Sequence, residues 1–206
     1  MNELEFSALL VSRVCHDLVS PLGAVVNGLE VLEDERDAAM RADALKIVGS
    51  SAAQALARIQ FMRIAFGAAG SAGAELDLGE IGRLVTGLFA GSKVTLEWGA
   101  ANLHWPKDWA KLLMNATLLA ADCLPRGGTV TVTTGDATSA PSFRIHAASP
   151  HARVLEEVER ALRGDTQTGQ ADARVVQTFL THKLARSLNA GLTLTAGEGS
   201  VELAAG

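Results

Sequence analysis

The sequence predicts an α+β protein, in which an N-terminal antiparallel helical hairpin is followed by a two-layer α/β sandwich. Three observations support this prediction: apolar residues recur at helical spacing in the first third of the chain, small residues interrupt it at 67–75, and helical and alternating patterns are mixed from there to the end. The chain has 206 residues, of which 48% are hydrophobic, and can therefore bury the core of one large domain or of two small ones.

The first expected helix covers residues 6–32, where apolar side chains form two rows with seven-residue spacing. One row consists of Val11, Leu18, Val25 and Leu32, and the other of Cys15, Leu22 and Leu29. After a polar turn at 33–37, a second helical pattern continues to about Phe66. Because a lone hairpin cannot bury both rows, we expect two copies to pair into a four-helix bundle in a homodimer.

The segment GAAGSAGAE at 67–75 contains no large side chain and is typical of a linker. It places an N-terminal domain at 1–70 and a second domain at 76–206. In the second domain we expect helices at 78–89, 105–124, 151–162 and from 173 to about 189, and strands at 93–98, 128–134, 142–148, 192–197 and 200–205. Helices on one face of such a mixed sheet form a two-layer sandwich.

Composition and charge exclude several classes of function. The net charge of −5 and the absence of a run of Lys or Arg argue against a nucleic-acid partner. No apolar stretch reaches the roughly 18 uninterrupted residues of a membrane span, so we expect a cytoplasmic protein without a membrane partner. Cys15 and Cys123 have no second Cys or His at ligand spacing, so neither a disulfide framework nor a metal site is expected.

His16 is the candidate functional residue. It lies about 160° round the helix from Leu18 and therefore points away from the expected bundle core. Ser12 and Ser20 lie four residues to either side on the same face, which leaves open approach to the imidazole. Asp17 follows directly, and a carboxylate there can hold one ring nitrogen protonated so that the other acts as a nucleophile.

The segment CHDLVSPLGAVVNGLEVL at 15–32 resembles the phosphoacceptor box of sensor histidine kinases, in which a His and an acidic residue precede a Pro-Leu pair on the first helix of a dimerising (DHp) bundle. The matching residues are His16, Asp17, Pro21 and Leu22. This resemblance implies that His16 receives a phosphoryl group. Within a helix, Pro21 would also free a backbone carbonyl and kink the chain near the active face.

Residues 111–134 are similar to the N-box helix and the following strand of the kinase ATP-binding (Bergerat or GHKL) domain, but the nucleotide contacts are missing. Asn115 occupies the first N-box asparagine position, whereas Leu119 occupies the second and cannot ligate Mg²⁺. HAASPHARV at 146–154 replaces the expected Asp-x-Gly-x-Gly motif, and residues 170–185 contain no glycine-rich lid. We therefore expect a degenerate ATPase-like domain that binds neither ATP nor a metal.

This combination resembles the ChpT-type histidine phosphotransferases of alphaproteobacteria. The resemblance implies that His16 accepts a phosphoryl group from the receiver domain of a hybrid kinase of the CckA type and passes it to response regulators of the CtrA and CpdR types in cell-cycle control. Asp17 would orient the ring or act as a base, and the receiver would supply Mg²⁺. The candidates for receiver docking are Ser12, Arg13, Val14, Val19 and Ser20.

Two other functions stay open from the sequence. A divergent histidine kinase would label itself from ATP, and Leu119 argues against it. A non-enzymatic dimeric adaptor would use the bundle to dock or inhibit a kinase, and its activity would survive replacement of His16 by Ala.

Overall fold

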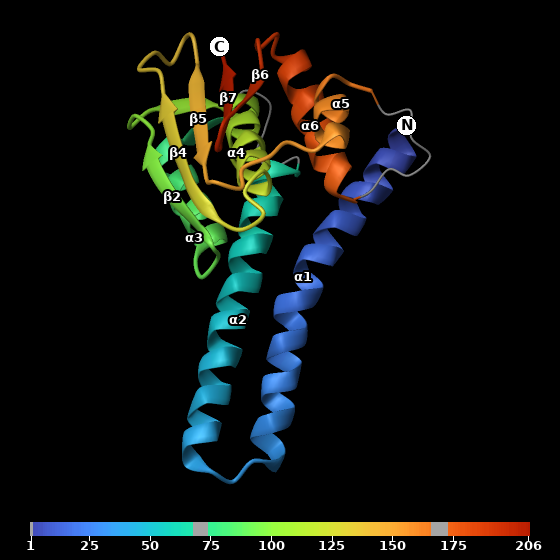
Figure 1. Ribbon diagram of the computed structural model, residues 1–206, viewed down its shortest axis with the longest axis vertical. Helices are drawn as coiled ribbons and strands as arrows, with labels where there is room; N and C mark the ends of the chain where they lie inside the picture. Colours follow the sequence, from blue (N-terminus) through green and yellow to red (C-terminus); the bar gives the residue numbers. More distant parts are fainter. Residues whose placement is uncertain (1, 68–73, 166–172) are drawn as a thin grey trace.

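Two long antiparallel helices form a hairpin that extends from the rest of the molecule (Figure 1). The structure is a computed structural model that describes residues 2–67, 74–165 and 173–206. Helix α1 spans Glu3–Asp34 and helix α2 spans Ala38–Ala65, which confirms the predicted hairpin. Most of the predicted linker, residues 68–73, lies outside the described part of the chain.

Side chains at the helix ends fix where the two helices begin. The Glu5 backbone N–H donates to the Asn2 side chain at 2.8 Å, and the Asn2 backbone N–H donates to the Glu5 carboxylate at 2.9 Å. At the start of α2, the Asp37 carboxylate accepts from two backbone N–H groups of the first turn. Between the helices, the backbone N–H groups of Asp37 and Arg36 donate to the Glu35 carboxylate and lower its pKa.

The two helices of the hairpin meet along a face that includes Pro21 and Gly28, both of which are buried. A Cβ atom on Gly28 would lie 2.6 Å from Val48 Cγ2, so glycine allows α1 and α2 to approach closely. Of the two predicted apolar rows, only Leu18, Val25 and Leu32 are half-buried, and Val11, Cys15, Leu22 and Leu29 are exposed. The rows therefore lie beside the contact with α2 and not in its centre.

The second part of the chain is a mixed five-stranded sheet with the order β2-β4-β5-β7-β6. The strands are β2 (Val94–Gly99), β4 (Gly128–Thr134), β5 (Phe143–Ala148), β6 (Thr193–Gly197) and β7 (Ser200–Ala205). Strands β2 and β4 are parallel, and all other neighbours are antiparallel. The short strands β1 (Glu75–Asp77) and β3 (His104–Pro106) form a separate antiparallel pair that the sequence did not predict, because three residues are too few to show an alternating pattern.

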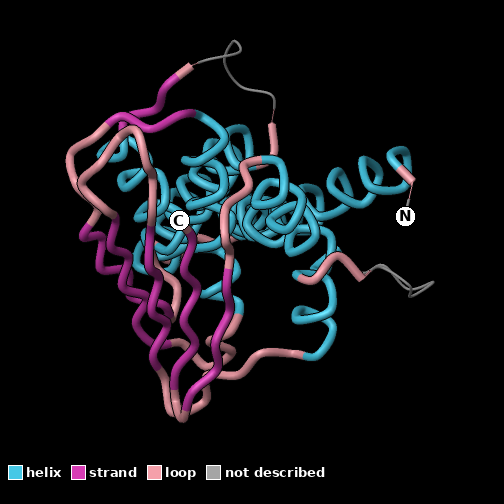
Figure 2. Tube along the Cα trace, turned by 90° about the horizontal axis from the view of Figure 1, so that it is seen from above, coloured by secondary structure: helices cyan, strands magenta, loops and turns pink. Residues whose placement is uncertain are grey.

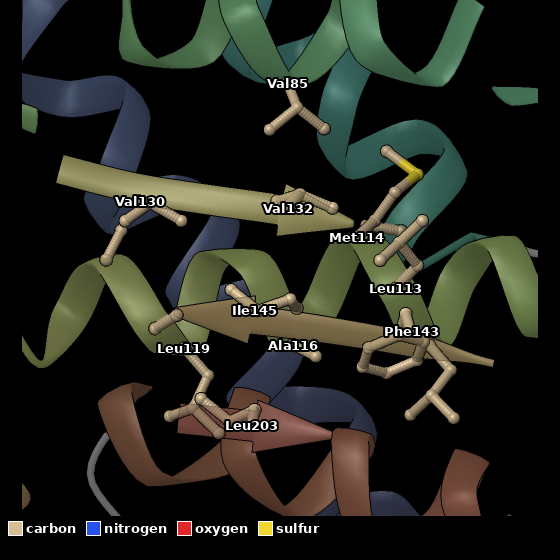
Figure 3. Packing of buried hydrophobic residues seen from close by; sticks show 14 of the residues in the cluster. Val85, Leu113, Met114, Ala116, Leu119, Val130, Val132, Phe143, Ile145 and Leu203 are labelled. Atoms are coloured by element: carbon tan, nitrogen blue, oxygen red, sulfur yellow. The ribbon is translucent and has the colours of Figure 1, made fainter. Parts of the chain in front are cut away.

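Helices pack on one face of this sheet and complete the predicted two-layer sandwich (Figure 2). They are α3 (Leu78–Phe89), α4 (Lys107–Asp122), α5 (Glu156–Leu162) and α6 (Ala173–Ser187). Figure 3 shows side chains of the sheet, including Val132, Ile145 and Leu203, packed against Ala116 and Leu119 of α4. Burial of these apolar side chains is the main force that holds α4 in place.

Some predicted boundaries were wrong. The helix expected at 151–162 begins only at Glu156. The preceding loop is not helical, because its backbone hydrogen-bonds to another segment: the Arg153 N–H donates to the Cys123 carbonyl at 3.0 Å. Pro106 caps α4 and is not its first helical residue. At the end of α6, the predicted stop is confirmed by Asn189, which has a positive φ of 50°.

The N-terminal turns of α1 dock on α6 and so join the hairpin to the sandwich. The rings of Phe6 and Phe179 meet edge to face, with their centroids 5.8 Å apart. The ammonium group of Lys183 lies 4.8 Å from the centroid of the Phe6 ring, within the range of a cation–π contact. These contacts place α4, α5 and α6 beside the part of α1 that carries His16.

By length and composition alone, α1 could cross a membrane, since an 18-residue window of it has a mean hydropathy of 1.4. In the described structure this helix has protein partners, because it packs along α2 and against α6.

Gly82 provides a test of how α3 packs on the sheet. A Cβ atom there would lie 2.7 Å from Trp98 Cδ1 of β2, so we expect Gly82→Ala to lower the free energy of unfolding by about 2 kcal/mol, which chemical denaturation would measure. Gly87→Ala is the matched control in the same helix, because its Cβ would lie 3.7 Å from Ala57 Cβ. The control should be neutral or stabilising by up to about 1 kcal/mol, and equal effects of the two changes would contradict this packing.

Candidate functional site

His16 lies on the middle part of α1 and presents its ring to solvent. Its side chain is 71% exposed, whereas the side chain of the adjacent Asp17 is only 15% exposed. Ser12 and Ser20 are exposed, as expected for residues one helical turn to either side. The imidazole is therefore open to a macromolecular partner, and the carboxylate beside it is held within the protein.

Asp17 makes two side-chain contacts, one with each carboxylate oxygen. Its Oδ1 lies 3.1 Å from His16 Nδ1, and its Oδ2 accepts a hydrogen bond of 2.8 Å from Arg13 Nε. An ionised carboxylate can only accept hydrogen bonds, so this contact favours the neutral tautomer with the proton on Nδ1. In that tautomer, Nε2 carries the free lone pair, as a nucleophile requires.

Pro21 lies within α1 and is buried, and the helix continues past it to Asp34. Because proline has no backbone N–H, the carbonyl of Asp17, four residues earlier, has no helical donor from that position. Arg58 of α2 donates to this carbonyl through Nη1 at 2.8 Å. The backbone effect predicted for Pro21 is therefore accompanied by a specific hydrogen bond from the neighbouring helix.

Two of the five residues predicted to dock receivers do not share the open face of His16. Arg13 is buried, because it pairs with Asp17 and its Nη2 also lies 3.8 Å from Asp122 Oδ2 at the end of α4. Val14 is half-buried and lines an apolar groove between α1 and α2. Ser12, Val19 and Ser20 remain exposed and stay candidates for receiver docking.

A cavity of about 370 Å³ lies beside His16, between α1 and the sandwich. Its wall includes Arg13 and Asp17 from α1, Asp122 from the end of α4, and Arg153 and Glu157 from around the start of α5. Two cations and three carboxylates thus line this cavity, on one side of the imidazole. The sequence did not predict that Asp122, Arg153 and Glu157 would be part of the site, because local patterns do not show which distant segments pack beside α1.

The N-box residues of α4 are part of the core. Asn115 is 0% exposed, and its side-chain amide donates to the backbone carbonyls of Ala65 and Lys111, each at 2.9 Å. Gln177 of α6 donates to the Asn115 backbone carbonyl at 2.8 Å and to Asn115 Oδ1 at 3.3 Å. Leu119 is also buried, at 1% exposure. The side chain of Asn115 is therefore committed to joining α2, α4 and α6.

The buried Cys123 thiol and the acidic side chains near His16 do not form a second reactive centre. Burial raises the pKa of the Cys123 thiol to about 12, with a further contribution from the charge of Asp122, so the thiol is protonated at neutral pH. Within residues 2–67, 74–165 and 173–206, there is no group of three or more His, Cys, Asp or Glu side chains that could hold a metal ion. His16 is the nucleophile that the described geometry favours.

Comparison with known proteins assigns the second part of the chain to a family. Residues 78–200 match the model of the histidine phosphotransferase C-terminal domain. This match covers more than half of the chain and includes α3 through β6.

Two relatives resemble the chain over almost its whole length. The protein phosphotransferase ChpT of Brucella abortus (strain 2308) is 37% identical over 196 residues, which are 95% of this chain and 92% of that protein. A solved structure of a bacterial phosphotransferase superposes with a TM-score of 0.90 at 34% identity and covers 100% of this chain and 98% of its own. The chain belongs to the histidine phosphotransferase family.

Proposed function

We propose that His16 accepts a phosphoryl group from the aspartyl phosphate of one receiver domain and passes it to the aspartate of another. The observation that carries this proposal is the contact between Asp17 Oδ1 and His16 Nδ1, which leaves Nε2 of an exposed ring as the attacking atom. Membership of the histidine phosphotransferase family supports the same chemistry. We assign to Asp17 the role of orienting the ring.

In the transfer step, the lone pair of Nε2 attacks phosphorus in line with the bond to the receiver's aspartate. The N–P bond forms as the P–O bond breaks, and the electron pair of that bond leaves with the carboxylate oxygen. The ring keeps its proton on Nδ1 and becomes cationic, so the charge of Asp17 stabilises the phosphorylated product. The reverse step returns the phosphoryl group to a second receiver, and Mg²⁺ in each receiver's acidic site would neutralise the moving group.

A role without ATP is supported by the state of the N-box. Asn115 is buried and bonded to three helices, and Leu119 offers no oxygen for Mg²⁺. We therefore propose a phosphotransferase that is not an ATP-dependent kinase and that binds no cofactor of its own. The divergent-kinase alternative would require this core to open.

A homodimer is supported by an apolar face that the hairpin leaves uncovered. On α1, Val11, Leu22 and Leu29 are 63%, 49% and 48% exposed, and they lie within about 20° of one another round the helix. Ile59 of α2 is 46% exposed and lines the groove in which Val11 lies. A second copy would cover this face by forming a four-helix bundle, which leaves His16 on the outside.

The finer assignment follows the family resemblance. We propose a hybrid kinase of the CckA type as donor and response regulators of the CtrA and CpdR types as acceptors, in cell-cycle control. The identity of 37% with ChpT of Brucella abortus supports this relay, and it also supports a cytoplasmic location. In the adaptor alternative, the chain would instead dock a kinase without taking part in transfer.

A receiver domain carrying a radiolabelled aspartyl phosphate tests the chemical role of His16 and Asp17. We expect label on the wild-type protein, none on His16→Ala, and transfer slowed by about 10- to 100-fold in Asp17→Asn, because the ring loses its charged partner. Asp43→Asn is the matched control, since Asp43 is exposed on α2, away from His16, and pairs with Lys46. Label on His16→Ala would exclude His16 as the acceptor, and label taken directly from ATP would restore the kinase alternative.

The mass of the protein in solution tests the homodimer. We expect light scattering to give twice the 21.5 kDa of one chain for the wild type and the mass of one chain for Leu29→Glu, because a charge would be placed within the apolar face. Val31→Glu is the control, because Val31 is exposed on another side of α1. If Leu29→Glu kept the wild-type mass, this face would not be the dimer interface.

A further inference from the structure

Two arginines from different helices bind Asp17. Arg13 of α1 donates through Nε to Asp17 Oδ2, and Arg58 of α2 donates through Nη1 to the Asp17 backbone carbonyl, each at 2.8 Å. The Asp17 and Arg13 side chains are only 15% and 9% exposed, so water screens this ion pair little. One arginine therefore fixes the carboxylate of Asp17 and the other fixes its backbone.

The contact made by Arg58 depends on Pro21. In an uninterrupted helix, the N–H of residue 21 would donate to the carbonyl of Asp17, but proline has no N–H. The Arg58 guanidinium supplies the missing donor from α2, 41 residues along the chain. Pro21 creates an unpaired acceptor next to the phosphoacceptor histidine, and Arg58 occupies it.

Arg58 is also incompletely paired, since its Nε is buried and has no hydrogen-bond partner within the described residues. A buried donor without a partner is unfavourable for stability, so its presence calls for an explanation. Arg58 thus donates to Asp17 through Nη1 while its own Nε is left unpaired. We explain this unpaired donor by the position that the Nη1 contact imposes on the guanidinium.

We propose that Arg58 and Arg13 are positioning residues for phosphoryl transfer by His16. Arg58 holds the backbone at Asp17, and Arg13 holds Oδ2, so that Oδ1 stays against His16 Nδ1 and Nε2 keeps its lone pair toward the receiver. Both arginines act through Asp17, and neither bonds to the imidazole. This inference rests on the proposed role of His16 as phosphoacceptor.

A double-mutant cycle between Arg58 and Pro21 tests the contact on the backbone. Arg58→Met keeps an unbranched apolar chain but removes the donor, and we expect it to slow transfer at saturating receiver by about tenfold, with less than a twofold change in the KM for the receiver. In the Pro21→Ala background, the new N–H bonds to the Asp17 carbonyl, so the same change should slow transfer less than twofold. Equal losses in the two backgrounds, or no loss in either, would overturn the role of Arg58.

Two further variants keep this test decisive if Pro21→Ala perturbs the helix. Arg58→Lys retains a cationic donor and should recover at least half of the wild-type rate, whereas a rate as low as that of Arg58→Met would count against the proposal. Lys46→Met removes a cation from an exposed part of α2, where Lys46 pairs with Asp43, and should leave the rate unchanged. Circular dichroism melting on each variant confirms that it is folded.

The role of Arg13 is tested by the tautomer of His16 in the full-length protein without any receiver. Nitrogen NMR of ¹⁵N-histidine-labelled protein, with the His16 signals assigned by comparison with His16→Ala, reports which ring nitrogen carries the proton. We expect the Nδ1–H form of neutral His16 in the wild type and a mixture of both forms in Arg13→Met. An unchanged tautomer in Arg13→Met would overturn its role, and because no receiver is present this result is independent of whether transfer occurs.

Discussion

The site depends on one carboxylate that is held from several directions. One carboxylate oxygen of Asp17 accepts a hydrogen bond from Arg13, and the other faces His16 Nδ1. The backbone carbonyl of Asp17 accepts a hydrogen bond from Arg58. Because these contacts use different atoms of one residue, they fix its position without occupying the outer edge of the imidazole. An exposed histidine ring is normally free to rotate and to exchange tautomers, whereas here its partner Asp17 is itself hydrogen-bonded to two arginines. If His16 is the phosphoacceptor, as proposed, its ring is therefore oriented before a receiver binds.

The sandwich supports this arrangement through its buried core. Asn115 and Gln177 form a buried hydrogen-bonded link between α4 and α6. Helix α6 in turn contacts the start of α1, where the rings of Phe179 and Phe6 meet edge to face. The hairpin is thereby held against the end of α4, where Asp122 lies near Arg13. We infer that the domain serves as a scaffold that shapes one side of the approach to His16, because Asn115 is buried in its core and hydrogen-bonded to neighbouring helices.

The sequence was sufficient for the features that depend on local patterns. Helical spacing of apolar residues predicted the hairpin, strand and turn patterns predicted all five strands of the main sheet, and the neighbouring His16 and Asp17 marked the candidate site. It failed where a side chain meets a distant segment. Arg13 was assigned to the open face because a helix considered alone does not show that the sandwich covers that side. Arg58 was missed because Pro21 predicts a free carbonyl but not which donor, 41 residues away, will reach it.

The identity of the phosphorylated ring nitrogen tests the central claim most directly. The wild-type protein, phosphorylated by a receiver domain and kept at alkaline pH to preserve the N–P bond, would be analysed by phosphorus and nitrogen NMR. We expect the phosphoryl group on Nε2 of His16, because Asp17 holds the proton on Nδ1. Phosphorylation on Nδ1 would contradict the account, because Asp17 could then not be holding the proton on that nitrogen. Phosphorylation on any other residue would contradict the proposed role of His16.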